Sequence, residues 1–232
     1  MTVKTKQYAT FTVILVLTLV LTMAAYRLTS RKWILYRNGE DLFFAQRFSE
    51  AIPLLRQAIQ GGVNRPEAGL YLADAFMATR QFEDALSVYQ ALLSQVPDHE
   101  TVLWRLTSLY EQFGRFPDAL ALADRLLKIK PQDASVMLRM ARYYRNVQSY
   151  HQSENLYRIL VSRYPNLVHL QLELAETISW QKKYSEAALC YQDILRNHPQ
   201  NRSARIQLAR VLFWSGRLDD AISEYSMVLG EN

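Results

Sequence analysis

The sequence predicts an all-α fold, an α-solenoid of about six helix pairs preceded by a single transmembrane helix. A small residue recurs every 34 residues without a slip, at Ala51, Ala85, Ala119, Ser153, Ala187 and Ala221. Proline closes four of these units, and an uncharged run lies near the amino terminus. A fixed period of this length is typical of helix pairs that stack into a solenoid.

The uncharged run comprises residues 8–26, between a basic tail of residues 1–7 and a basic juxtamembrane segment of residues 27–31. As a helix, the run would rise about 28 Å, close to the roughly 30 Å hydrocarbon core of a bilayer. A cleaved signal peptide is the alternative, but its apolar core is usually shorter, about 7–15 residues. We therefore expect a retained, single-pass anchor in the cell (inner) membrane.

The net charge of +5 comes from this amino-terminal region. Residues 1–37 hold six basic residues and no acidic one, which leaves 21 basic residues of the 27 to face 22 acidic ones. A domain without a basic excess argues against nucleic acid as a partner. The count of basic residues favours a cytoplasmic solenoid. The short basic tail also resembles a signal anchor that exports the rest of the chain, so the side of the membrane stays open.

The solenoid is expected to occupy residues 32–232, with helix pairs that start near residues 32, 66, 100, 134, 168 and 202. Gly114 and Gly216 mark the turn inside a pair, where a left-handed residue ends a helix at little cost. The other units carry Gln46, Arg80, Gln148 and Lys182 there. Proline cannot continue a helix interior, and it separates the units at Pro97, Pro131, Pro165 and Pro199. Because no proline or glycine precedes Gly39, the anchor helix is expected to run into the first pair.

The second helix pair, which starts near residue 66, carries the clearest family likeness. The segment Tyr71-Leu72-Ala73-Asp74-Ala75-Phe76, with Ala85, Tyr89 and Pro97, resembles a tetratricopeptide repeat, and the similarity covers residues 32–232. The resemblance implies a right-handed superhelix whose first helices line a concave groove for a peptide or partner protein. The Ser-Trp and Phe-Trp-Ser-Gly-Arg elements of the last two repeats are similar to those of bacterial proteins of exopolysaccharide assembly and export.

The sequence contains no recognisable catalytic motif, so we expect no enzyme, no cofactor and no metal site. The four histidines are scattered, and there is no His-Glu-x-x-His, Gly-x-Ser-x-Gly or glycine-rich phosphate loop. Acidic pairs at the starts of second helices suit the positive end of the helix dipole. The single cysteine, Cys190, cannot form an internal disulfide and is expected to pack as a small apolar side chain.

Charged residues spaced by three lie along one face of each first helix. Equivalent positions form two rows, one of Arg105, Arg139, Glu173 and Gln207, the other of Ser108, Arg142, Glu176 and Arg210. The candidate partner-binding residues are Trp104, Arg105, Arg139, Arg142, Arg145, Glu173, Glu176, Trp180, Arg210 and Trp214. They are interpreted either as ion pairs between repeats, worth about 0–1 kcal/mol each if exposed, or as a charged ligand groove, and both can hold. The pattern does not match the Lys/Asn clamp by which some tetratricopeptide domains hold a terminal carboxylate.

Two functions fit these features. The first is a non-catalytic, membrane-anchored scaffold for partner proteins, with an envelope or exopolysaccharide-export complex as its setting. The alternative is a polysaccharide-binding protein in which Trp104, Trp180 and Trp214 stack on sugar rings. The last helix carries Ile222, Tyr225, Met227, Val228 and Leu229 with no following helix to cover them. This predicts either docking or homo-oligomerisation through this end, or a chain that is part of something longer.

Overall fold

The computed structural model describes the backbone of residues 3–230 and the side chains of residues 15–23 and 30–230. This part of the chain forms twelve helices and divides into two compact units, Met1–Val102 and Leu103–Asn232, each of which is described by itself. The helices are α1 (Val3–Phe44), α2 (Phe48–Gln60), α3 (Pro66–Ala78), α4 (Phe82–Gln95), α5 (Glu100–Gln112), α6 (Phe116–Ile129), α7 (Ala134–Asn146), α8 (Tyr150–Arg163), α9 (Val168–Trp180), α10 (Tyr184–Asn197), α11 (Arg202–Trp214) and α12 (Leu218–Leu229).

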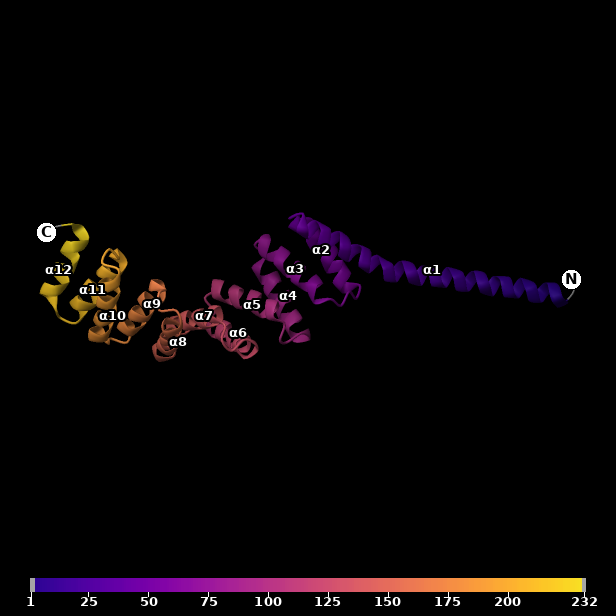
Figure 1. The fold of residues 1–232 in the computed structure, drawn as a ribbon. Helices are drawn as coiled ribbons and strands as arrows, with labels where there is room; N and C mark the ends of the chain where they lie inside the picture. Colours follow the sequence, from indigo (N-terminus) through magenta and orange to yellow (C-terminus); the bar gives the residue numbers. More distant parts are fainter. Residues whose placement is uncertain (1–2, 231–232) are drawn as a thin grey trace. The chain divides into compact units, whose positions relative to one another are not determined.

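The first unit is built around the long helix α1. This helix continues without a break for 42 residues, and α2 packs against its carboxy-terminal part (Figure 1). The predicted start of the first pair, near Lys32, therefore lies inside α1. Helix α3 contacts both α1 and α2, and α4 packs on α3. Four aromatic rings join these helices, because Phe43 stacks on Tyr71 and also meets Phe44 and Phe48.

The second unit repeats one arrangement. Each helix from α7 to α12 packs on the helix before it in the sequence, as Figure 1 shows. Helices α7, α9 and α11 begin at Ala134, Val168 and Arg202, where the 34-residue period places the first helix of a pair. Contacts between sequence neighbours are what a solenoid requires, since each pair buries its apolar face only against the next.

The recurring small residue is buried in every repeat. All six members, from Ala51 to Ala221, are at most 1% exposed, because a larger side chain there would force the helices apart. The one polar member, Ser153, donates its hydroxyl to the carbonyl of Ala141 at 2.7 Å, which satisfies the buried group. Four residues later, Tyr89, Tyr157 and Tyr191 are also fully buried.

The turn inside each pair is left-handed at one fixed position. The residues there have φ between 59° and 82°, and they are Gln46, Arg80, Gly114, Gln148, Lys182 and Gly216. Glycine adopts this conformation freely, whereas other residues pay a steric cost. The period therefore preserves the turn geometry even where it does not preserve the glycine.

The amino-terminal prediction rests on residues that the structure describes only in part. Nowhere in the described residues is there a helical stretch of the length and apolarity that a membrane crossing needs. Within the predicted span of residues 8–26, only the side chains of residues 15–23 are described. The rest of that span, the tail of residues 1–7 and most of the basic segment 27–31 lie outside the described side chains.

Candidate functional site

The candidate residues lie on α5, α7, α9 and α11, the first helices of the second unit; their shared surface is called the first-helix face here. Polar contacts on this face join residues 31 apart: Arg139 with Ser108, Arg142 with Glu173, and Arg145 with Glu176. The sequence grouped equivalent positions, 34 apart, into two rows and interpreted them as ion pairs between repeats, and the structure shows such ion pairs between residues 31 apart. Neighbouring first helices are offset by about one turn, which brings the residue three positions earlier into reach.

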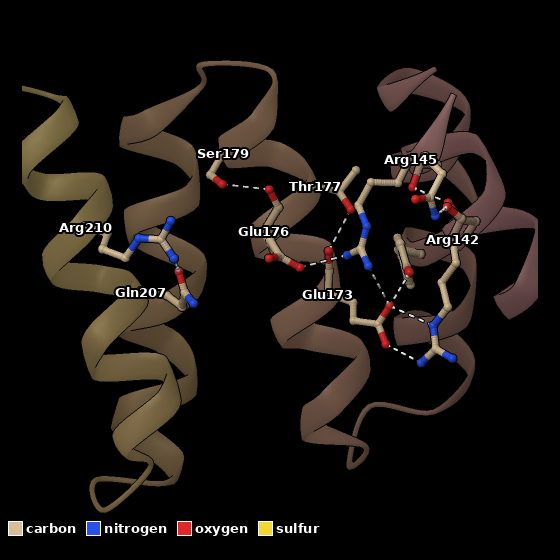
Figure 2. Close-up of polar contacts among 12 residues, drawn as sticks. Arg142, Arg145, Glu173, Glu176, Thr177, Ser179, Gln207 and Arg210 are labelled. Carbon is tan, nitrogen blue, oxygen red and sulfur yellow. Dashed lines mark hydrogen bonds and ion pairs between the residues drawn. The ribbon is translucent and has the colours of Figure 1, made fainter. Parts of the chain in front are cut away.

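Glu173 is the centre of this face. Its carboxylate accepts two hydrogen bonds from Arg142, at 2.5 and 3.1 Å, and a third from the hydroxyl of Tyr157 on α8. Arg145 lies 3.8 Å away, and only 18% of the Glu173 side chain is exposed. Burial alone would raise the pKa of Glu173, but the hydrogen bonds from Arg142 and Tyr157 hold it below its usual value. This glutamate thus ties α9 to α7 and α8 (Figure 2).

The next turn forms a hollow beside Trp180. Arg145 donates to Glu176 at 2.8 Å, and both line a space of about 350 Å³ with Tyr150 and Trp180. The indole of Trp180 stacks on Tyr150, with ring centres 6.4 Å apart and planes within 12°. Trp180 is still 55% exposed. An exposed indole at the rim of a hollow suits a partner side chain, because tryptophan is a favoured contact residue at interfaces.

The amino-terminal part of the face, on α5 and α7, is more occupied by its own contacts. The guanidinium of Arg139 lies 5.1 Å from the ring centre of Trp104, and it also contacts Ser108 and Glu111 at 2.8 and 3.6 Å. Trp104 is half-buried. Arg105 is exposed, one position from Trp104 on α5. Arg139 is thus engaged by side chains of its own protein, and this end of the face contributes mainly to the stability of the fold.

The carboxy-terminal part of the face carries Arg210 and Trp214 on α11. The guanidinium of Arg210 lies 4.9 Å from the ring centre of Trp214, and it donates to Gln207 at 3.0 Å. Trp214 is 45% exposed, and its ring centre lies 5.8 Å from the ring centre of Tyr184. The aromatic pairs of Trp180 and Trp214 are thus equivalent, 34 residues apart, and both open to solvent.

A second ionic cluster, which the sequence reasoning missed, centres on Glu154 of α8. Its carboxylate accepts from Arg158 at 2.8 Å, from Gln181 at 2.6 Å and from Lys183 at 3.0 Å, and its side chain is 9% exposed. Burial opposes the charge, but these donors prevail and lower the pKa of Glu154 to about 2. Equivalent positions in other units are uncharged, such as Ala188, so a lone acid at this site was the available signal. The cluster links α8 to the turn before α10.

Within the described residues, no group of three His, Cys, Asp or Glu side chains could hold a metal ion. Burial raises the pKa of the Cys190 thiol, which disfavours the reactive thiolate. The chemistry on the first-helix face is hydrogen bonding, charge and aromatic contact, the chemistry of recognition.

Comparison with known proteins agrees with this architecture. Family profiles described as tetratricopeptide repeat match residues 70–134, 135–167 and 179–232. A tetratricopeptide repeat protein from Parabacteroides merdae is 19% identical, with 88% of this chain and 80% of that chain covered and a TM-score of 0.65. A MamA structure is 13% identical, with 72% and 91% covered and a TM-score of 0.62.

A MamA from Desulfovibrio magneticus is 17% identical, with 73% and 97% covered and a TM-score of 0.59. No curated protein sequence gave a significant match. These identities show a shared fold alone, while the three family matches together cover more than half of the chain. The chain belongs to the tetratricopeptide repeat family.

Proposed function

We propose that this protein is a non-catalytic scaffold that binds partner proteins through the first-helix face. The observation that carries the proposal is the exposed Trp180 at the rim of a hollow of about 350 Å³, with polar groups from Arg145 and Glu176 around it. Proteins with this fold generally act in protein–protein interaction. Glu173 and Glu154 fix the neighbouring helices by ionic contacts, so the face offers a partner a surface that is already ordered.

A photo-crosslinking amino acid at position 180 tests this proposal in intact cells. Leu189 on α10 is the matched control, because it is a large apolar residue and 62% exposed on a second helix. We expect discrete protein adducts from position 180 that position 189 does not give. The same adducts from both positions, or adducts from neither, would contradict partner binding through the first-helix face.

We further infer that residues 8–26 anchor the scaffold in the cell (inner) membrane as a single span. The support is the uncharged run and the unbroken helix α1, which joins this segment to the first repeat. The full-length protein should then stay in the membrane pellet at pH 11 and be released by detergent. Release by alkali alone would exclude an integral anchor. Alkaline phosphatase and green fluorescent protein fused after Asn232 report the side on which the repeats lie.

An envelope assembly such as an exopolysaccharide-export complex is the setting that we infer from the Phe-Trp-Ser-Gly-Arg element of residues 213–217. Direct polysaccharide binding is the second candidate, and the exposed indole of Trp180 favours it. Sugar stacking needs an open ring face, however, and guanidinium groups lie over the rings of Trp104 and Trp214. Protein partners are therefore the better match.

A second contact surface is inferred on α12. Ile222, Tyr225, Met227 and Leu229 are between 38% and 67% exposed there, and an apolar patch of this kind is typical of an interaction site. We propose that this surface docks a partner or a second copy of the chain. Light scattering of the purified protein and of Ile222→Glu distinguishes them. A dimer that the substitution dissociates supports self-association, whereas a monomer in both cases rules it out.

A further inference from the structure

The first unit contains a basic hollow between α1 and the end of α2. It has a volume of about 240 Å³, and its lining consists of Arg31, Lys32, Leu35, Gln57, Gln60 and Gly61. Two cations and two amides thus surround the space, and the lining contains no carboxylate. Pockets that enclose a drug-sized ligand are larger, at roughly 300–1,000 Å³. The hollow therefore suits a small anionic group.

Two glycines shape this hollow. A Cβ on Gly61 would lie 3.1 Å from the Cβ of Lys32, so a larger residue would crowd the contact between α1 and α2. Gly62 has a φ of 88°, and its carbonyl accepts a hydrogen bond from the Lys32 ammonium at 3.1 Å. The equivalent pairs of later repeats are Gln95-Val96, Ile129-Lys130, Arg163-Tyr164 and Asn197-His198. The first repeat thus departs from the others at the point where its backbone holds Lys32.

Both cations keep donors available for a ligand. Lys32 uses one of its three ammonium donors for Gly62. Arg31 is exposed, and among the described residues no hydrogen bond or ion pair engages its guanidinium. The first acidic residue along the chain, Glu40, accepts a hydrogen bond from Tyr36 at 2.8 Å instead. An anion in the hollow would therefore meet two positive charges that no carboxylate of the lining neutralises.

The hollow lies at a fixed distance from the proposed membrane span. Helix α1 has no break between residue 26, where that span ends, and Arg31, and this part of the helix rises about 8 Å. The headgroup layer on each side of a bilayer is about 5–8 Å thick. Arg31 and Lys32 would therefore lie at the outer edge of the headgroups. Trp33, which is 39% exposed, follows directly, and tryptophan is enriched at membrane interfaces.

We propose that this hollow binds the phosphate of an anionic phospholipid, with Arg31 and Lys32 as charged donors and the amides of Gln57 and Gln60 as neutral ones. This inference rests on the membrane anchor proposed above and adds the lipid that the anchored protein selects. A lipid fits better than a free phosphate, because the span would hold the hollow at the level of the headgroups. Basic residues beside a span attract anionic lipids electrostatically. A bound lipid would link α1 and α2 to the bilayer surface.

The test uses the 232-residue chain in micelles of a neutral detergent, mixed with equal amounts of phosphatidylglycerol and phosphatidylcholine. Native mass spectrometry then measures which lipid the protein retains. Both lipids carry a phosphate diester, but only phosphatidylglycerol has a net negative charge. We expect phosphatidylglycerol to be retained with a preference of at least about tenfold, because two basic residues attract it.

Gln60→Glu is the most specific variant, because it keeps the size of the side chain and places a carboxylate in the hollow. That carboxylate would occupy Arg31 and Lys32 in place of the phosphate, so the preference should fall below twofold. Gln95→Glu is the matched control, because Gln95 is exposed and ends α4 as Gln60 ends α2. Its preference should stay within twofold of that of the unchanged chain.

Arg31→Gln should lower the preference about fivefold, since it removes one of the two charges. Arg37→Gln is its control, because Arg37 is an exposed residue of α1 outside the hollow. That variant should retain the full preference. Far-ultraviolet circular dichroism and thermal melting verify that each variant folds.

Equal retention of the two lipids by the unchanged chain would overturn the proposal. Equal losses in Gln60→Glu and Gln95→Glu, or in Arg31→Gln and Arg37→Gln, would reduce the effect to net charge and overturn it as well. Displacement of phosphatidylglycerol by inorganic phosphate would make free phosphate the ligand.

The alkaline extraction described above separates the headgroup site from the anchor. A protein that stays in the membrane pellet but shows no lipid preference keeps its anchor and lacks only the headgroup site. A protein that alkali releases lacks the anchor, and the lipid proposal falls with it.

Discussion

Replacing Glu154 by glutamine is expected to lower the free energy of unfolding of the second unit by about 2 kcal/mol. The substitution keeps the size of the side chain and removes its charge. Arg158, Lys183 and Gln181 then lose the carboxylate that joins α8 to the turn before α10. Because that turn joins the two helices of the next repeat, α9 and α10, the loss loosens the contact between two repeats.

The magnitude follows from the protonation equilibrium of Glu154. Its pKa falls from 4.5 to about 2, and at roughly 1.4 kcal/mol for each pH unit the ionised form contributes about 3 kcal/mol. The side chains of Arg158 and Lys183 are 48% and 38% exposed, so solvent screens part of this attraction. The estimate is therefore reduced to about 2 kcal/mol. A depressed pKa contributes stability that is complete above pH 4.5 and is lost as the pH falls through 2.

Urea unfolding followed by circular dichroism and tryptophan emission measures the change at pH 7 and at several values down to pH 2. Trp180 directly precedes Gln181, so its emission reports on this contact. Glu186→Gln is the control, because Glu186 also pairs with Arg158 but both side chains are more than 40% exposed; its cost should stay below about 1 kcal/mol. The reasoning fails if Glu154→Gln costs no more than the control, or if its effect persists unchanged at pH 2.

Three further predictions concern other parts of the fold. Arg142→Ala should cost about 1–2 kcal/mol in urea unfolding, because it leaves the mostly buried Glu173 with weaker partners; a change under about 0.3 kcal/mol would contradict that role. Arg80→Gly should raise, and Gly114→Ala should lower, the free energy of unfolding, each by about 0.5–1 kcal/mol, since both have φ near 60°. Opposite signs would refute the strain argument. Cys190 should react slowly with Ellman's reagent at pH 7 and faster as the pH rises or urea unfolds the chain, because burial raises its pKa; full reaction within seconds would count against it.

The solenoid was predictable because its signals are local and periodic. The small residue at Ala85 and its equivalents, the turn position of Arg80 and the prolines recur at one spacing, and the structure places them in buried contacts, left-handed turns and helix ends. The helix ends, the turn and the buried contacts of each helix pair are therefore encoded within about 34 residues. A sequence of this kind specifies the units well.

The contacts between neighbouring repeats were less predictable. The period identifies equivalent positions, but the crossing of neighbouring helices decides which positions meet, and Arg142 meets Glu173 instead of Glu176. Glu154 escaped notice because its partners belong to the next turn, 27 and 29 residues away. Side-chain contacts across a repeat boundary need the three-dimensional register, and a single sequence does not contain it explicitly.

The 31-residue register also makes the order of the repeats matter. Removing residues 168–201 would keep the period intact and leave every remaining turn at its place in its repeat. It would also bring Gln207 to the position of Glu173 and Arg210 to that of Glu176. Arg142 would then face a neutral amide, and Arg145 would face another guanidinium, a repulsive pairing. The repeats are therefore equivalent in backbone geometry but not in charge. The ion pairs make each repeat specific for its present neighbours.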